Sequence, residues 1–217
     1  VSVSSGADAI TSAFPAIKHF NLEISIVLVL FFMFMNLRGL RESAKSLMIP
    51  VYLFIVSILF LIAYGAFQIL TGHLAYTATA HVGKVVPGVS LILLLRAFTS
   101  GSASLTGVEA ISNAVPFFKK PKEKNAAGTL AIMSLILGIM FAGITFLNYW
   151  LGILPSEHVT VLAQIAQRIF GNSPIGNTLF YIFQLSTALI LAVAANTGFS
   201  AFPMLSFNMA KNKYMPH

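Results

Sequence analysis

The sequence predicts an all-α polytopic membrane protein, and three observations support this class. Of its 217 residues, 57% are hydrophobic and only 9% are charged, with a mean hydropathy of +0.86. A soluble domain carries about a quarter charged residues, so this chain has too few to cover a surface in water. Apolar runs recur at about the 20-residue length that one membrane crossing needs. Basic residues are confined mostly to the short segments between those runs. We therefore expect lipid to solvate most of the chain.

The apolar runs predict the helices in order. The opening residues 1–14 resemble the end of a helix that Pro15 terminates, so we expect the chain to be an internal piece of a longer protein. Membrane spans are expected over 22–37, 48–70, 88–115, 126–154 and 176–207. The segment 159–170 is amphipathic and too short to cross, so it is expected to lie on the membrane surface. Together these elements form one transmembrane domain fragment covering 1–217.

The basic residues predict the orientation of the spans. Nine of them fall in the loops on one side: Arg38, Arg41, Lys45, Lys119, Lys120, Lys122, Lys124, Lys211 and Lys213. Three fall in the loops on the other side: Lys18, Lys84 and Arg168. Cytoplasmic loops carry the excess of Lys and Arg, so the first set is predicted to face the cytoplasm.

Composition and motifs also exclude several classes of protein. The formal net charge of +7 is explained by topology and anionic headgroups, so no nucleic-acid partner is expected. There is no cysteine, and the histidines show no ligand spacing, so no metal site beyond an alkali cation is expected. No phosphate-binding loop, nucleophile elbow, HExxH or paired carboxylates occur. The chain is therefore not expected to be an enzyme or to bind a cofactor.

The span 88–115 contains a stretch that disfavours a continuous helix. Seven of the nine residues from Thr99 to Gly107 are Thr, Ser or Gly. Gly destabilises a helix interior, and Ser and Thr compete for backbone hydrogen bonds. Transporters use such breaks to expose backbone oxygens to an ion near the midplane. The possible hydroxyl or backbone contributors are Ser100, Gly101, Ser102 and Ser104. The alternative is that the small residues permit close packing against another helix.

An acidic residue follows this stretch. Glu109 is the only acid between Glu42 and Glu123, and a carboxylate within a membrane usually faces a partner or a pathway. Thr106 lies three residues earlier, on the same face of a helix if the helical turn persists that far. Hydroxyl and carboxylate oxygens together suit a hard cation, and a buried carboxylate can also exchange a proton. The alternative is that Glu109 pairs with a lysine at the cytoplasmic end of the span.

Three strings together resemble a known family. SGSASLTGVEAISNAVPFFKKPKEKNA resembles the sixth helix and following loop of the KUP-like potassium importers of the KimA type, within the amino acid/polyamine/organocation (APC) superfamily. NLRGLRESAKSLMIPVYLF resembles the turn between the fourth and fifth helices of that family, and AANTGFSAFPMLSFNMAKNKYMP the end of the eighth. The resemblance implies a LeuT-type fold with inverted repeats, of which this chain would run from the end of the third helix to the end of the eighth.

The resemblance also implies a function and a site. It implies secondary active import of K⁺ by symport with H⁺ in a bacterial plasma membrane. The T-G-V-E motif places Thr106 and Glu109 among the cation ligands, with Glu109 also a candidate for proton coupling, and VSVSSG makes Ser2 a third ligand. A homodimer is a further expectation, and cyclic di-AMP would bind only through regions absent from this chain. The rival interpretation is a proton-coupled amino acid permease of the same superfamily, which has the same fold.

Overall fold

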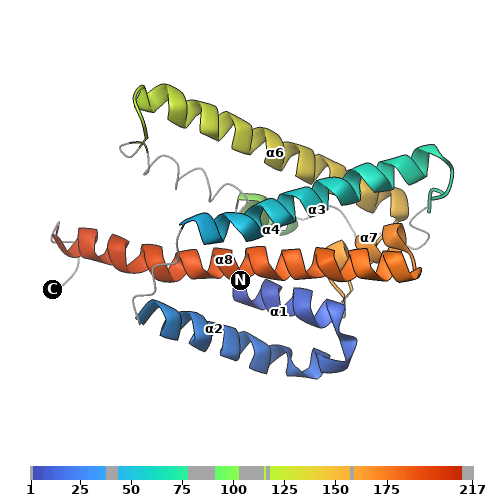
Figure 1. Ribbon diagram of the computed structural model, residues 1–217, viewed down its shortest axis with the longest axis horizontal. Helices are drawn as coiled ribbons and strands as arrows, with labels where there is room; N and C mark the ends of the chain where they lie inside the picture. The colour runs from blue at the N-terminus through green and yellow to red at the C-terminus, as the bar shows by residue number, and fades with distance from the viewer. Residues whose placement is uncertain are drawn as a thin grey trace. The chain divides into compact units, whose positions relative to one another are not determined.

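The computed structural model describes residues 2–37, 44–77, 91–102, 115, 118–156 and 159–211. These residues form helices and connecting turns, and the described part contains no β-strand (Figure 1). The elements are α1 (Ser2–Ala13), the 3₁₀ helix η1 (Pro15–Phe20), α2 (Asn21–Leu37), α3 (Ala44–Leu70), α4 (Leu91–Ser102), α6 (Lys122–Leu151), α7 (Val161–Phe170) and α8 (Pro174–Lys211). The predicted all-α class is confirmed.

Three helices in the described part are long and apolar enough to cross a membrane. Their apolar segments are Met48–Leu70 in α3, Lys122–Leu151 in α6 and Pro174–Asn196 in α8. The helices themselves extend beyond the predicted spans: α3 begins at Ala44 and α6 at Lys122, where spans were expected from 48 and 126. Hydropathy identifies only the part of a helix that lipid can solvate. Polar helical turns beyond the lipid are therefore not predicted by it.

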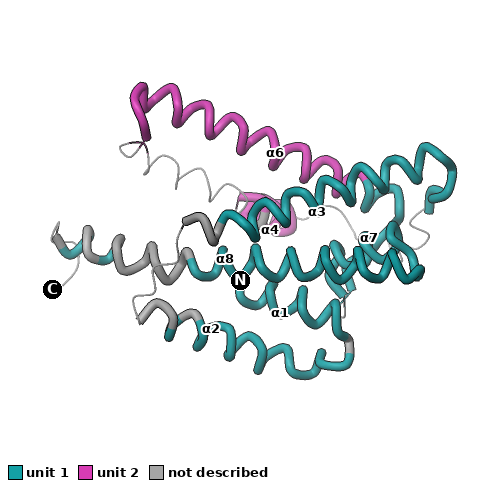
Figure 2. The backbone as a smooth tube through the Cα atoms, in the orientation of Figure 1, with its two compact units in different colours: residues 1–77, 147–217 teal, residues 78–146 magenta. Residues whose placement is uncertain are grey.

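The chain forms two compact units (Figure 2). The first comprises residues 1–77 and 147–217, and the second comprises residues 78–146. The described part of the second unit consists mainly of α4 and of α6 up to Phe146. The first unit holds the remaining helices.

In the first unit α8 is the central element, because it contacts α1, α2, α3 and α7. Small residues let α1 approach it closely: a Cβ on Gly6 would lie 3.6 Å from the Cβ of Leu191. Ala9 of α1 is also buried, and Phe183 of α8 is only 1% exposed. Close approach through small side chains is typical of helix packing in membranes.

The short helix α7 is held in place by its ends and by one apolar face. The hydroxyl of Thr160 accepts a hydrogen bond from the backbone N–H of Ala163 at 3.3 Å, which caps the N-terminus. Gly171 ends the helix with a φ of 68°, a conformation that favours glycine. The apolar face is buried through Ala163, Ile165, Ala166, Ile169 and Phe170. The predicted amphipathic helix 159–170 corresponds to this element.

The helix α4 includes the first residues of the stretch that was predicted to break it. Residues 99–102, assigned to the start of the predicted break, are helical. The Thr99 hydroxyl donates to the carbonyl oxygens of Leu95 and Arg96, and the Ser102 hydroxyl donates to the carbonyl oxygen of Phe98 at 2.9 Å. Each hydroxyl donates its hydrogen bond to a carbonyl of the preceding turn, and this turn stays helical. The rest of the predicted break, from residue 103, lies outside the described residues.

Candidate functional site

The predicted cation ligands are only partly within the described structure. Thr106, Glu109 and Ser104 lie outside the described residues, so their predicted roles stay predictions. The end of α4 is formed by the backbone of Ser100 and by Gly101 and Ser102. Ser2 begins α1 and is half-buried. Ser2 belongs to the first unit and the end of α4 to the second.

The described end of α4 has a chemistry that suits a cation. The carbonyl groups in the last turn of a helix carry a partial negative charge. At Ser102 the hydroxyl proton is donated to Phe98, which leaves the hydroxyl oxygen able to accept or coordinate. Hydroxyl and carbonyl oxygens are therefore both present where the chain runs on toward Thr106.

A cluster between the C-terminal half of α1 and the start of α2 was not predicted from the sequence. The side-chain amide of Asn21 donates to Asp8 Oδ1 at 2.8 Å and to Thr11 Oγ1 at 3.3 Å. The Thr11 hydroxyl in turn donates to the carbonyl oxygen of Asp8 at 3.3 Å. These bonds tie α1 to the start of α2 across η1. The i, i+3 spacing of Asp8 and Thr11 was a readable signal, but the contact with Asn21 depends on the turn that Pro15 begins.

A buried polar stripe on α8 faces α1 and α3. Its members are Gln184, Ser186 and Thr187, all buried. The Gln184 amide donates to the carbonyl oxygen of Ala9 at 3.3 Å, which joins α8 to α1. Ser186 Oγ lies 2.8 Å from Ser57 Oγ, which joins α8 to α3. Interhelical bonds of this kind help to hold membrane helices together.

Ser57 and Ser186 have fewer hydroxyl protons than hydrogen-bond contacts. Ser57 can donate to the carbonyl oxygen of Phe54 at 2.9 Å, and Ser186 to that of Phe183 at 2.7 Å. Each hydroxyl has one proton, so the bond between the two hydroxyls forms only when one of them releases its own carbonyl. Either serine can therefore be the donor in the bond between the two hydroxyls, and the two arrangements have the same helix packing.

An aromatic cluster lies where the turn after α3 meets the C-terminal end of α6. The Trp150 indole donates to the carbonyl oxygen of Leu74 at 3.3 Å, and its ring meets that of Tyr76 edge-on at 5.3 Å. A hydrogen bond with Tyr149, and the unfavourable charge of a second phenolate there, raise the pKa of Tyr76 above its ordinary value. Such a belt is typical of the membrane–water boundary.

Comparison with known proteins gives two matches. A family model described as amino acid permease matches residues 1–217. A protein of Bacillus subtilis (strain 168) named Potassium transporter KimA is 54% identical over all 217 residues. This chain spans 35% of the length of that relative. The resemblance stated from the three sequence strings is confirmed.

Proposed function

This chain belongs to the amino acid permease family, and from that premise we propose that it is part of a secondary transporter that imports potassium by proton symport. Its family and its apolar helices make it a multi-pass protein of the plasma membrane. The family is one of permeases, which points to a transporter and not to an enzyme. The direction, the coupling and the site are the parts that we propose.

The observation that supports potassium is the 54% identity, which extends over the whole chain to a relative named as a potassium transporter. The family model by itself fits an amino acid permease equally well. Fold cannot distinguish these substrates, because the same scaffold carries either. The oxygen-rich composition of residues 99–109 agrees with a bare cation better than with a substrate that has its own carboxylate.

In the proposed mechanism the cation loses water and binds oxygens around the end of α4. Ser2, Thr106 and Glu109 are the proposed side-chain ligands, and Ser100 to Ser104 contribute carbonyl or hydroxyl oxygens. Movement of part of the helix bundle against the rest then opens the cytoplasmic side. Glu109 acts either as a ligand or as the proton carrier, because burial favours its neutral form and a nearby cation favours its charged form.

The test is uptake of rubidium or potassium by vesicles that contain the full-length protein. Glu109→Gln removes the charge but keeps the shape, and we expect uptake to fall to near background. Glu123→Gln makes the same change at an exposed position in the first turn of α6 and should retain uptake. Thr106→Val should also lose uptake, whereas Thr106→Ser, which keeps the hydroxyl, should retain most of it.

Two results would reject parts of this proposal. Cation uptake that survives Glu109→Gln would remove the proposed site but leave the transport function. Uptake of an amino acid without any dependence on potassium would reject the function itself.

A further inference from the structure

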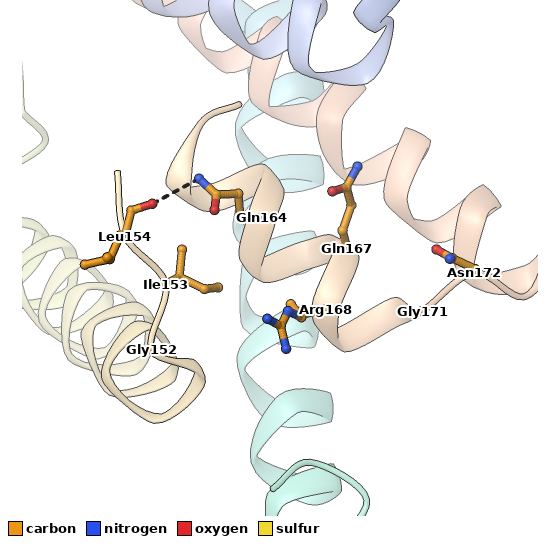
Figure 3. A pocket seen from close by; sticks show the side chains of 8 residues that line it. All are labelled: Gly152, Ile153, Leu154, Gln164, Gln167, Arg168, Gly171 and Asn172. Carbon is orange, nitrogen blue, oxygen red and sulfur yellow. Dashed lines mark hydrogen bonds between the residues drawn. The ribbon is translucent and has the colours of Figure 1, made fainter. Parts of the chain in front are cut away.

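A polar cavity of about 580 Å³ lies beside α7 in the first unit (Figure 3). Three stretches of chain form its wall: the residues that follow α6, part of α7, and the turn that precedes α8. The lining residues are Gly152, Ile153, Leu154, Gln164, Gln167, Arg168, Gly171 and Asn172. The proposed transport mechanism uses none of them.

The ends of two apolar helices place this cavity at the edge of the membrane. One membrane-crossing helix ends at Leu151, directly before the cavity, and another begins at Pro174, directly after it. Tyr149 and Trp150 occupy the last turn of the first, as aromatic residues do at the level of lipid headgroups. The basic-residue pattern assigns this level to the outer side of the membrane.

Arg168 is the charged group of the cavity. It is exposed, and within the described residues no hydrogen bond or ion pair engages its guanidinium. Gln164 lies one turn earlier on α7, and Figure 3 shows both side chains on the side of the helix that faces Gly152–Leu154. The Gln164 amide donates to the carbonyl oxygens of Leu154 and Val159, at 3.3 and 3.1 Å, so it holds the wall together. Arg168 is left as the cationic donor.

The chemistry of the lining points to an anion. Among the described lining residues there is one guanidinium, three side-chain amides and no carboxylate. A guanidinium presents its N–H groups as a planar fork that matches two oxygens of a phosphate. Basic residues are also scarce on the outer side, so the general bias of topology does not account for Arg168.

We propose that this cavity binds the phosphate of an anionic phospholipid headgroup from the outer leaflet, with Arg168 as the principal contact. Gln167 and Asn172 provide additional amide donors. The apolar helix ends on both sides of the cavity lie where the acyl chains of such a lipid would run. The bound lipid would fasten the surface helix α7 to the ends of α6 and α8.

The test measures the melting temperature of the purified full-length protein during titration with phosphatidylglycerol, phosphatidylcholine or inorganic phosphate. Phosphatidylglycerol should raise the melting temperature of the wild type most. Arg168→Gln should weaken its apparent affinity roughly tenfold, the value expected for one charge-assisted hydrogen bond. Arg168→Lys, which keeps the charge but loses the fork, should weaken it less. Lys18→Gln removes the same charge from another segment assigned to the outer side, and it should leave the apparent affinity for phosphatidylglycerol unchanged.

Three results would overturn the proposal. Equal losses in Arg168→Gln and Lys18→Gln would mean that the lipid responds to the overall charge of the outer side and not to this cavity. An equal effect of inorganic phosphate would identify a soluble anion as the ligand. Glu157 lies outside the described residues and is the acid nearest to the cavity in sequence. If Glu157→Gln lowers the lipid-free melting temperature as much as Arg168→Gln does, the guanidinium serves an internal ion pair.

Discussion

Among the glycines that the structure describes, Gly176 has the least room for a side chain. It sits in the first turn of α8, where its N–H donates to Ser173 Oγ at 3.0 Å. A Cβ at this position would collide with the carbonyl oxygen of Phe170 and lie 2.9 Å from that of Gly171. Both atoms belong to the backbone, so the α7–α8 turn itself would have to move.

Gly176→Ala is therefore expected to destabilise the protein by about 1–3 kcal/mol, the usual cost of forcing extra atoms into a packed site. Thermal unfolding of the purified protein measures this loss. Gly128→Ala is the matched control, because that glycine lies within α6 and no atom comes within 4 Å of its added Cβ. Alanine favours a helix over glycine by roughly 1 kcal/mol, so Gly128→Ala should not lower stability. A Gly176→Ala protein as stable as the wild type would contradict the close approach.

Among single residues, a candidate that stands out by its residue type was easier to predict than one whose role depends on a contact with a distant residue. The rarity of acids in a membrane span singled out Glu109 from the sequence, although its surroundings lie outside the described residues. Asp8 was missed, because its partner Asn21 is 13 residues away and meets it only through the turn of η1. Ser57 and Ser186 were missed for the same reason, since 129 residues separate them.

At the scale of the element, α7 shows how a short helix can be stable. It has only 10 residues, and isolated helices of that length are marginal in water. Burial of one face and capping at both ends supply the missing stability. The backbone N–H of Thr160 also donates to Ser12 Oγ at 3.1 Å, so the cap residue joins α7 to α1.

Thr160→Ala should weaken this helix by about 1 kcal/mol, because the N–H of Ala163 loses its acceptor. The backbone bond to Ser12 does not involve the Thr160 side chain and should persist. Hydrogen exchange of the amides at 161–164 measures the effect and should accelerate severalfold. Thr160→Ser keeps the capping oxygen and should exchange like the wild type. Unchanged protection in Thr160→Ala would show that the cap contributes nothing.

The same scale shows why the pattern of α7 was readable from the sequence, whereas the break predicted after the start of α4 stays a prediction. In α7 the alternation of apolar and polar residues reflects burial of one face, which sequence displays directly. In α4 the Thr and Ser content was interpreted as a helix-breaking signal. Within the described part of the helix, the hydroxyls of Thr99 and Ser102 bond to carbonyls of the preceding turn, which a helix permits. Composition alone cannot distinguish these two uses of a hydroxyl.

At the scale of the molecule, the predicted orientation rests on charge alone and the structure adds the positions of the helix ends. The turn after α3 contains no basic residue other than histidine over 71–77, whereas Lys119 to Lys124 surround the start of α6. Moving such residues across a membrane is unfavourable, so a cluster of lysines stays on the cytoplasmic side. The hydrogen bond from Trp150 to Leu74 brings the end of α6 and the turn after α3 to the same side of the membrane. The charge pattern predicts that this is the outer side.

The absence of cysteine from these 217 residues makes this orientation directly measurable. In a background without other cysteines, His73→Cys introduces a thiol in the exposed turn after α3, and Lys124→Cys introduces one in the exposed first turn of α6. A membrane-impermeant maleimide added to intact cells should label the first and reach the second only after the membrane is permeabilised. Because the two positions lie at opposite ends of membrane-crossing helices, labelling of both from outside would contradict the charge-based topology. Labelling of Lys124→Cys alone would invert it, and would move the cavity at Arg168 to the cytoplasmic leaflet.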